Sequence, residues 1–143
     1  MAITQTLCTS FKKALLDGEM DFSSNTSQSY KVALYTNSAS LDATTTVYTT
    51  SNEVSGTGYT AGGVALTIST APTTSGTTAY LSFNNATWAN STITARGALI
   101  YQTGGTTPAV AVLDFGSDKS TSGVTFQVTF PTANSTTAIV RVD

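Results

Sequence analysis

Residues 124 to 130 read VTFQVTF, and this stretch constrains the fold more than any other part of the chain. Apolar and polar side chains alternate along it, which is the period of a β-strand with one buried and one wet face. Pro131 follows, and proline has no N–H to donate to a neighbouring strand. The stretch therefore predicts a strand that ends at Phe130 and whose buried face carries Val124, Phe126, Val128 and Phe130.

Similar segments recur from Tyr30 to the end of the chain. Residues that favour turns separate them, mainly Gly, Asn, Asp, Ser and Pro. Thr is abundant and suits a pleated, half-buried surface, whereas charged residues are only 10% of the chain. We therefore expect an all-β fold, a β-sandwich or jelly-roll-like domain of about eight strands. The candidate strands are residues 30–36, 45–50, 64–70, 78–83, 94–102, 109–116, 124–130 and 137–143.

Residues 109 to 115 lack a polar face. Val110 and Val112 would lie on one face of this strand, and Ala111, Leu113 and Phe115 on the other. Because both faces are apolar, the pattern predicts a central strand that is covered on both sides.

The only predicted helix is short and spans residues 4 to 17. Ile3, Leu7, Phe11 and Leu15 recur every four residues, so they form one apolar stripe, and Gly18 suits a left-handed C-cap. Thr4 or Thr6 would cap the start. The stripe packs either on the domain's own sheet or on another subunit. We assign residues 1–29 to this helix and a polar connector, a candidate anchor, and residues 30–143 to the β-domain. Leu7, Phe11 and Leu15 are candidate partner-binding residues.

The stretch SGTGYTAGG at residues 55 to 63 partly matches two nucleotide-binding patterns. A P-loop needs Lys and Ser or Thr after its last glycine, but Val64 and Ala65 follow Gly63. The dinucleotide pattern needs a helix after it, but VALTIST reads as a strand. The stretch therefore predicts a glycine-rich turn between strands, with Tyr59 on the loop as a further candidate partner-binding residue.

The residues that carry catalysis are scarce. The chain has no His, and its single cysteine, Cys8, lies on the apolar stripe, where a buried, inert thiol is expected. Asp114 with Asp118, and the acidic turn at residues 17 to 21, offer carboxylates for a glycosidase pair or for calcium, but acidic residues are ordinary at turns. We expect a protein that is not an enzyme and has no cofactor or metal.

The six basic residues are scattered and the net charge is −2, so nucleic-acid binding is not expected. No apolar run approaches a membrane span, and the N-terminus lacks a secretion signal, so we expect no membrane partner and synthesis in a cytoplasm.

Five successive stretches resemble a group of small virion proteins of tailed bacteriophages: FKKALLDGEMDF, YKVALYT, NEVSGTGYTAGGVALT, ATWANSTITARGALIY and AVAVLDFGSDKSTSGVTFQVTFPT. The resemblance covers nearly the whole chain, and its motifs are structural, so it transfers no site residue. It implies a capsid cement or decoration protein on the outer surface of the virion, made in the host cytoplasm. The implied partners are the major capsid protein and copies of the chain itself, as a homotrimer.

Two other functions stay open. Proteins of similar composition occur in phage tails and fibres, so a tail component or receptor-binding β-domain is the first alternative. A carbohydrate-binding module or hydrolase is the second, and it would require an exposed aromatic face formed from Tyr48, Tyr59, Trp88 and Tyr101.

Overall fold

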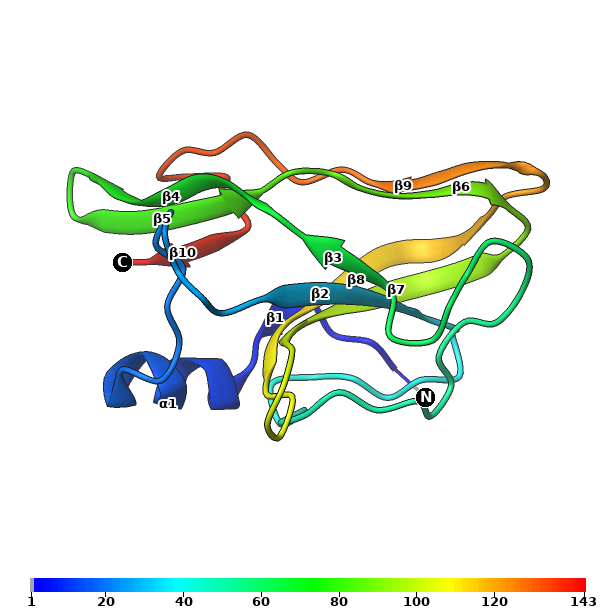
Figure 1. Ribbon diagram of the computed structural model, residues 1–143, viewed down its shortest axis with the longest axis horizontal. Coiled ribbons are helices and arrows are strands. Elements are labelled where there is room, and N and C mark those ends of the chain that lie inside the picture. Colours follow the sequence, from blue (N-terminus) through cyan, green and yellow to red (C-terminus); the bar gives the residue numbers. More distant parts are fainter. Residues whose placement is uncertain (1) are drawn as a thin grey trace.

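The computed structural model describes residues 2–143 and consists of two layers of antiparallel strands with one short helix (Figure 1). The all-β prediction is confirmed. Turns join most of the strands, whereas a long loop of residues 36–63 connects β2 to β3.

The first layer is a five-stranded sheet in the order β1-β8-β7-β2-β3. Its long central strands pair in register over most of their length, from Tyr30 opposite Gln102 to Tyr35 opposite Gly97. The bounds are β1 Thr6–Leu7, β2 Tyr30–Tyr35, β3 Val64–Leu66, β7 Thr94–Gln102 and β8 Ala109–Ser120.

The second layer contains a three-stranded sheet, β10-β5-β4, and a two-stranded sheet, β6-β9. Figure 1 shows them end to end along the longest axis, with β6 and β9 at the end away from α1. β6 leads into β7, and β8 into β9, through only two or three residues, so one long strand pair bends from one layer into the other. The bounds are β4 Ile68–Ser75, β5 Thr78–Phe83, β6 Ala86–Ser91, β9 Val124–Val128 and β10 Val140–Val142.

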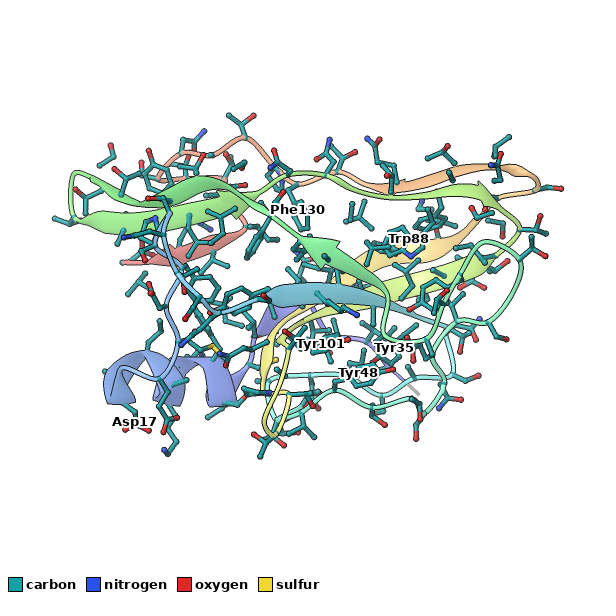
Figure 2. The ribbon with its side chains drawn as sticks, in the orientation of Figure 1. Asp17, Tyr35, Tyr48, Trp88, Tyr101 and Phe130 are labelled. Atoms are coloured by element: carbon teal, nitrogen blue, oxygen red, sulfur yellow. The ribbon has the colours of Figure 1, made fainter. Side chains whose placement is uncertain are left out.

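The main hydrophobic core fills the space between the two layers. Phe22 stacks on Tyr30 with ring centroids 4.4 Å apart, and Phe83 lies edge-on to Phe22. Trp88 packs edge-on against Phe126 at 6.0 Å. Figure 2 shows Trp88 and Phe130 on the side of the five-stranded sheet that faces the second layer. Phe126, Val128 and Phe130 are buried as predicted, but Val124 at the start of β9 is exposed.

A second, smaller core covers the opposite face of the five-stranded sheet. Tyr35, Leu99 and Val112 point into it from three neighbouring strands, and Ile3 and Leu41 cover it from two loops. In Figure 2, Tyr35, Tyr48 and Tyr101 lie on this side of the sheet. The middle of the sheet is thus buried on both faces, which explains why residues 32–35, 97–101 and 109–113 of its central strands are apolar.

The predicted helix is shorter than expected. α1 spans Thr9–Asp17, because the chain before it forms β1 and pairs with β8. Cys8 is the N-cap residue and makes no capping bond from its side chain, so the caps predicted at Thr4 and Thr6 are wrong. Gly18 ends the helix with φ 71°, as predicted. Its N–H donates a hydrogen bond to the carbonyl oxygen of Leu15, so this carbonyl of the last helical turn has a partner.

Several strand predictions need correction. Residues 45 to 50 form no strand and contribute only an isolated bridge between Val47 and Pro108. The strand predicted at 64–70 divides into β3 and β4, which belong to different layers. β6 was not predicted, because its ATWANS sequence alternates only weakly.

Residues 109–113 of β8 are buried on both faces as predicted, but Asp114 and Phe115 are half-buried, the rest of the strand is exposed, and the assignment of Val110 is wrong. The pairing with β7 shifts between Ile100 and Tyr101, so an extra residue bulges into β8 there. Val110 consequently joins Ala111 and Leu113 in the main core, whereas Val112 lies in the second core.

Candidate interaction surface

The structure separates the four predicted partner-binding residues. Phe11 is buried in the main core, and Leu7 is half-buried against it in β1. Tyr59 is half-buried, and its hydroxyl is used inside the molecule. Only Leu15 is exposed, with 37% of its surface accessible. The apolar stripe therefore packs mainly on the chain's own core, which was one of the two alternatives.

An apolar groove of about 280 Å³ lies beside Leu15. One wall is α1 with the turn after it, and the other is the three-stranded sheet β10-β5-β4. Figure 1 shows α1 and the strands β4, β5 and β10 at the same end of the molecule as the C-terminus. Leu15 and Val142 stand on opposite walls, and both are exposed. The walls also carry Met20, Pro72, Tyr80 and Leu81.

α1, which forms one wall of this groove, carries charged side chains in its first half and at its end. Lys12 and Lys13 lie in the first half of α1, and Asp17 and Glu19 lie at its end; all four side chains are exposed. Lys13 and Asp17 form an ion pair one turn apart. Leu16, between these charges, has 90% of its surface exposed. In Figure 2, Asp17 lies on the outer side of α1, away from the sheets.

A second groove, of about 440 Å³, lies between β8 and β9 near the opposite end of the molecule. Phe115, Phe126 and Val128 form its apolar floor, and Lys119 lies at its side. Among the described residues, β9 pairs only with β6, and β8 beyond Leu113 pairs only with β7. Two strand edges therefore border this groove with free backbone groups, a geometry that an added strand can extend.

The glycine-rich loop at residues 55 to 63 is a turn, as predicted, and Glu53 anchors it. Tyr59 donates its hydroxyl to Glu53 Oε1 at 2.7 Å, and the Gly62 N–H donates to the same oxygen at 2.7 Å. Tyr48 donates to Oε2 at 2.6 Å. One carboxylate therefore holds the middle and the end of the loop, and the Gly62 N–H that it accepts is not free to bind a phosphate.

Tyr101 fixes the same region together with Tyr48. Tyr101 donates to the Gly62 carbonyl oxygen at 2.7 Å and stacks on Tyr48 with centroids 4.6 Å apart. Burial raises the pKa of both hydroxyls, and that of Tyr59 as well. They therefore stay protonated as donors at neutral pH. Since the rings stack inside the molecule, they do not form the exposed aromatic face that a carbohydrate-binding module would need.

Asp114 and Asp118, which were considered as a catalytic pair, each have a structural partner. Asp114 accepts bonds from Arg96 Nε at 3.0 Å and from the Gly116 N–H at 2.9 Å. Both bonds lower the pKa of Asp114, and the bond from the Gly116 N–H has the larger effect. Asp118 accepts from Asn37 Nδ2 at 3.0 Å. Within residues 2–143, no group of three or more His, Cys, Asp or Glu side chains is placed to hold a metal ion.

Cys8 is fully buried between β1 and α1, and desolvation by burial, with a smaller effect from Asp42, raises its pKa to about 11. We expect this thiol to resist alkylation in the folded protein at pH 8, because only the exposed thiolate reacts. Mass spectrometry after iodoacetamide treatment measures this, with the same protein in guanidinium chloride as the control. Rapid alkylation without denaturant would contradict the burial.

Sequence reasoning missed Glu53 and both grooves. Glu53 is an isolated acid in a Thr- and Tyr-rich stretch, and that isolation was the available signal. The walls of the groove beside α1 come from residues more than 120 positions apart, from Leu15 to Val142, so no local pattern could show them. In residues 2–143 no helix is long and apolar enough to cross a membrane.

Comparisons of the chain with models of protein families, with curated proteins and with solved structures found no match. The two grooves and their exposed apolar rims are therefore interpreted from their own geometry and chemistry.

Proposed function

We propose that this protein is a structural component of a phage virion, a cement or decoration protein that binds the outer shell and stabilises contacts between capsid subunits. The observation that carries the proposal is the placement of exposed large apolar side chains at opposite ends of an elongated body. Leu15 and Leu16 belong to α1 and Val142 to β10 at one end, and Val124 starts β9 at the other end (Figure 1). A protein that joins neighbours needs at least two such contact surfaces.

The groove between β8 and β9 is the surface that we assign to the shell. Its floor is apolar, and the strand edges beside it offer backbone N–H and C=O groups. An extended segment of a capsid protein would pair with these groups while its side chains cover Phe115 and Val128. Val124, at the turn next to this groove, has 56% of its surface exposed.

The polar part of this surface suits repeated contacts. Along β8 and β9 it is formed largely by Thr, Ser and Gln side chains, including Ser120, Thr125 and Gln127. Hydroxyl and amide groups lose less hydration energy than charges when a partner covers them. A contact worth about 1 to 2 kcal/mol per copy, repeated over a shell, raises the barrier to rupture greatly because many contacts must break together.

Particles that lack this protein should release DNA at a lower temperature and under weaker osmotic shock than complete particles. Adding the purified protein back should restore both. The Val124→Asp variant should fold normally but fail to protect, because it places a charge at the proposed contact. Dye access to packaged DNA during heating measures release.

Val47→Asp is the matched control, since Val47 is 42% exposed but lies away from the groove between β8 and β9. It should protect as well as the original protein. Should particles without the protein be equally robust but fail to attach to cells, the cement role is wrong and a tail or receptor-binding role replaces it.

A further inference from the structure

We infer that the groove beside α1 is a self-association surface, and that its occupant is the α1 helix of a second copy of this chain, packed antiparallel about a two-fold axis. This inference does not depend on the proposed capsid role. It rests on the apolar content of the groove, on the exposure of Leu16 and on the order of charges along the helix.

The apolar part of the surface is incomplete in one chain. The groove is lined almost entirely by carbon, from Met20 and Leu81 at its floor to Pro72 and Tyr80 on the sheet wall. Leu15 and Val142 line it with 37% and 50% of their surfaces exposed, and Leu16, the next residue along α1, is 90% exposed. Three of the five large hydrophobic residues exposed in residues 2–143 thus gather around one end of the molecule. Exposed apolar clusters of this kind mark protein contacts.

Charge complementarity selects the occupant. α1 carries Lys12 and Lys13 in its first half, and Asp17 ends it, followed by Glu19. When two copies of such a helix lie antiparallel, the basic half of each faces the acidic end of the other. A parallel arrangement would place like charges side by side. A two-fold contact must be self-complementary, and this helix satisfies that condition.

The free charges in this pattern are Lys12 and Glu19. Lys13 already pairs with Asp17 of its own helix, whereas among the described residues neither Lys12 nor Glu19 forms an ion pair. Lys12 and Leu16 are one helical turn apart, so they lie on the same side of α1. In the antiparallel pair, Leu16 enters the groove of the second copy, and Lys12 approaches its Glu19.

The two-fold contact differs from the homotrimer that the resemblance to cement proteins implies, and the mass in solution distinguishes them. Sedimentation of the isolated protein over a range of concentrations should show a monomer of 14.7 kDa in equilibrium with a dimer. Leu16→Glu should weaken the dimer at least about tenfold, because it places a charge in an apolar contact. Val124→Glu, an equally polar change at the other end, should leave it unchanged.

A charge exchange tests the antiparallel arrangement. Lys12→Glu should weaken the dimer about fivefold, because symmetry repeats the change at two places. Adding Glu19→Lys should restore the original affinity. Circular dichroism checks that every variant is folded. A monomer at all concentrations, a trimer, a dimer that Leu16→Glu leaves intact, or a double variant as weak as Lys12→Glu would each overturn the inference. If the original protein dimerises as expected but does not restore the resistance of particles that lack it, only the capsid role is overturned.

Discussion

Replacing Gly63 with Ala should destabilise the folded protein much more than replacing Gly76 with Ala, although each change adds one methyl group. Gly63 has φ 77°, a conformation that side chains with a Cβ rarely adopt. A Cβ at this position would also lie 1.8 Å from the carbonyl oxygen of Val32 and 2.8 Å from Cα of Ala33. We expect a loss of roughly 2 to 6 kcal/mol in the free energy of unfolding, about half from backbone strain and half from overpacking.

Gly76→Ala is the matched control for this prediction. Gly76 has a similar φ, 60°, but an added Cβ would meet no atom within 4 Å. It should therefore lose only about 1 to 2 kcal/mol, the cost of the left-handed backbone. Urea unfolding of both variants measures the difference. If the two variants lose the same amount, the close approach of Gly63 to β2 does not hold.

The position of Gly63 also explains what the sequence alone could and could not predict. The glycines at residues 55 to 63 were correctly predicted to form a turn, because the strand after them excludes a nucleotide-binding helix. The reason for two adjacent glycines lies elsewhere in the chain. Gly63 contacts β2, and Gly62 donates its N–H to Glu53. Contacts between distant segments leave no local pattern to read.

The strands were predicted best where alternation or continuous burial is strong. β5 and β7 begin and end at the residues expected, and β2 differs by one residue. Prediction failed where a tertiary feature changed the local pattern. A bulge moves Val110 to the other face of β8, and the pairing of Thr6 with Val112 makes a strand of residues whose spacing resembles a helix. The spacing of Ile3, Leu7 and Phe11 was real, but the three residues lie in an isolated bridge, in β1 and in α1, and they pack on two different cores.

The candidate surface was less predictable than the fold for a related reason. Leu15 was identified because it continues the stripe of the helix, and it does border a groove. Phe11, in the same stripe, proved to be part of the core. A sequence pattern shows which residues share a face, but whether a sheet of the same chain covers that face depends on the topology.

Deleting residues 1 to 20 should abolish folding of the isolated protein. The deletion removes β1, which pairs with the central strand β8, and it removes side chains from both cores. Ile3, Cys8, Phe11 and Met20 are all buried, and each large apolar side chain lost from a core costs about 2 to 5 kcal/mol. Their sum reaches the whole stability of an ordinary domain, about 5 to 15 kcal/mol.

The exposed residues of the same segment provide the control. Leu16→Ala changes a side chain that is 90% exposed, so it should leave the unfolding temperature unchanged at concentrations where the protein is monomeric, while weakening self-association. Circular dichroism and thermal unfolding of the two proteins separate the contributions. A truncated chain that remains a stable β-domain would show that residues 1 to 20 form a separable anchor. A truncated chain that unfolds would support the place of Phe11 in the core. A Leu16→Ala variant that folds but associates weakly would place Leu16 at the contact surface. Two residues only five positions apart on one helix would then have different roles.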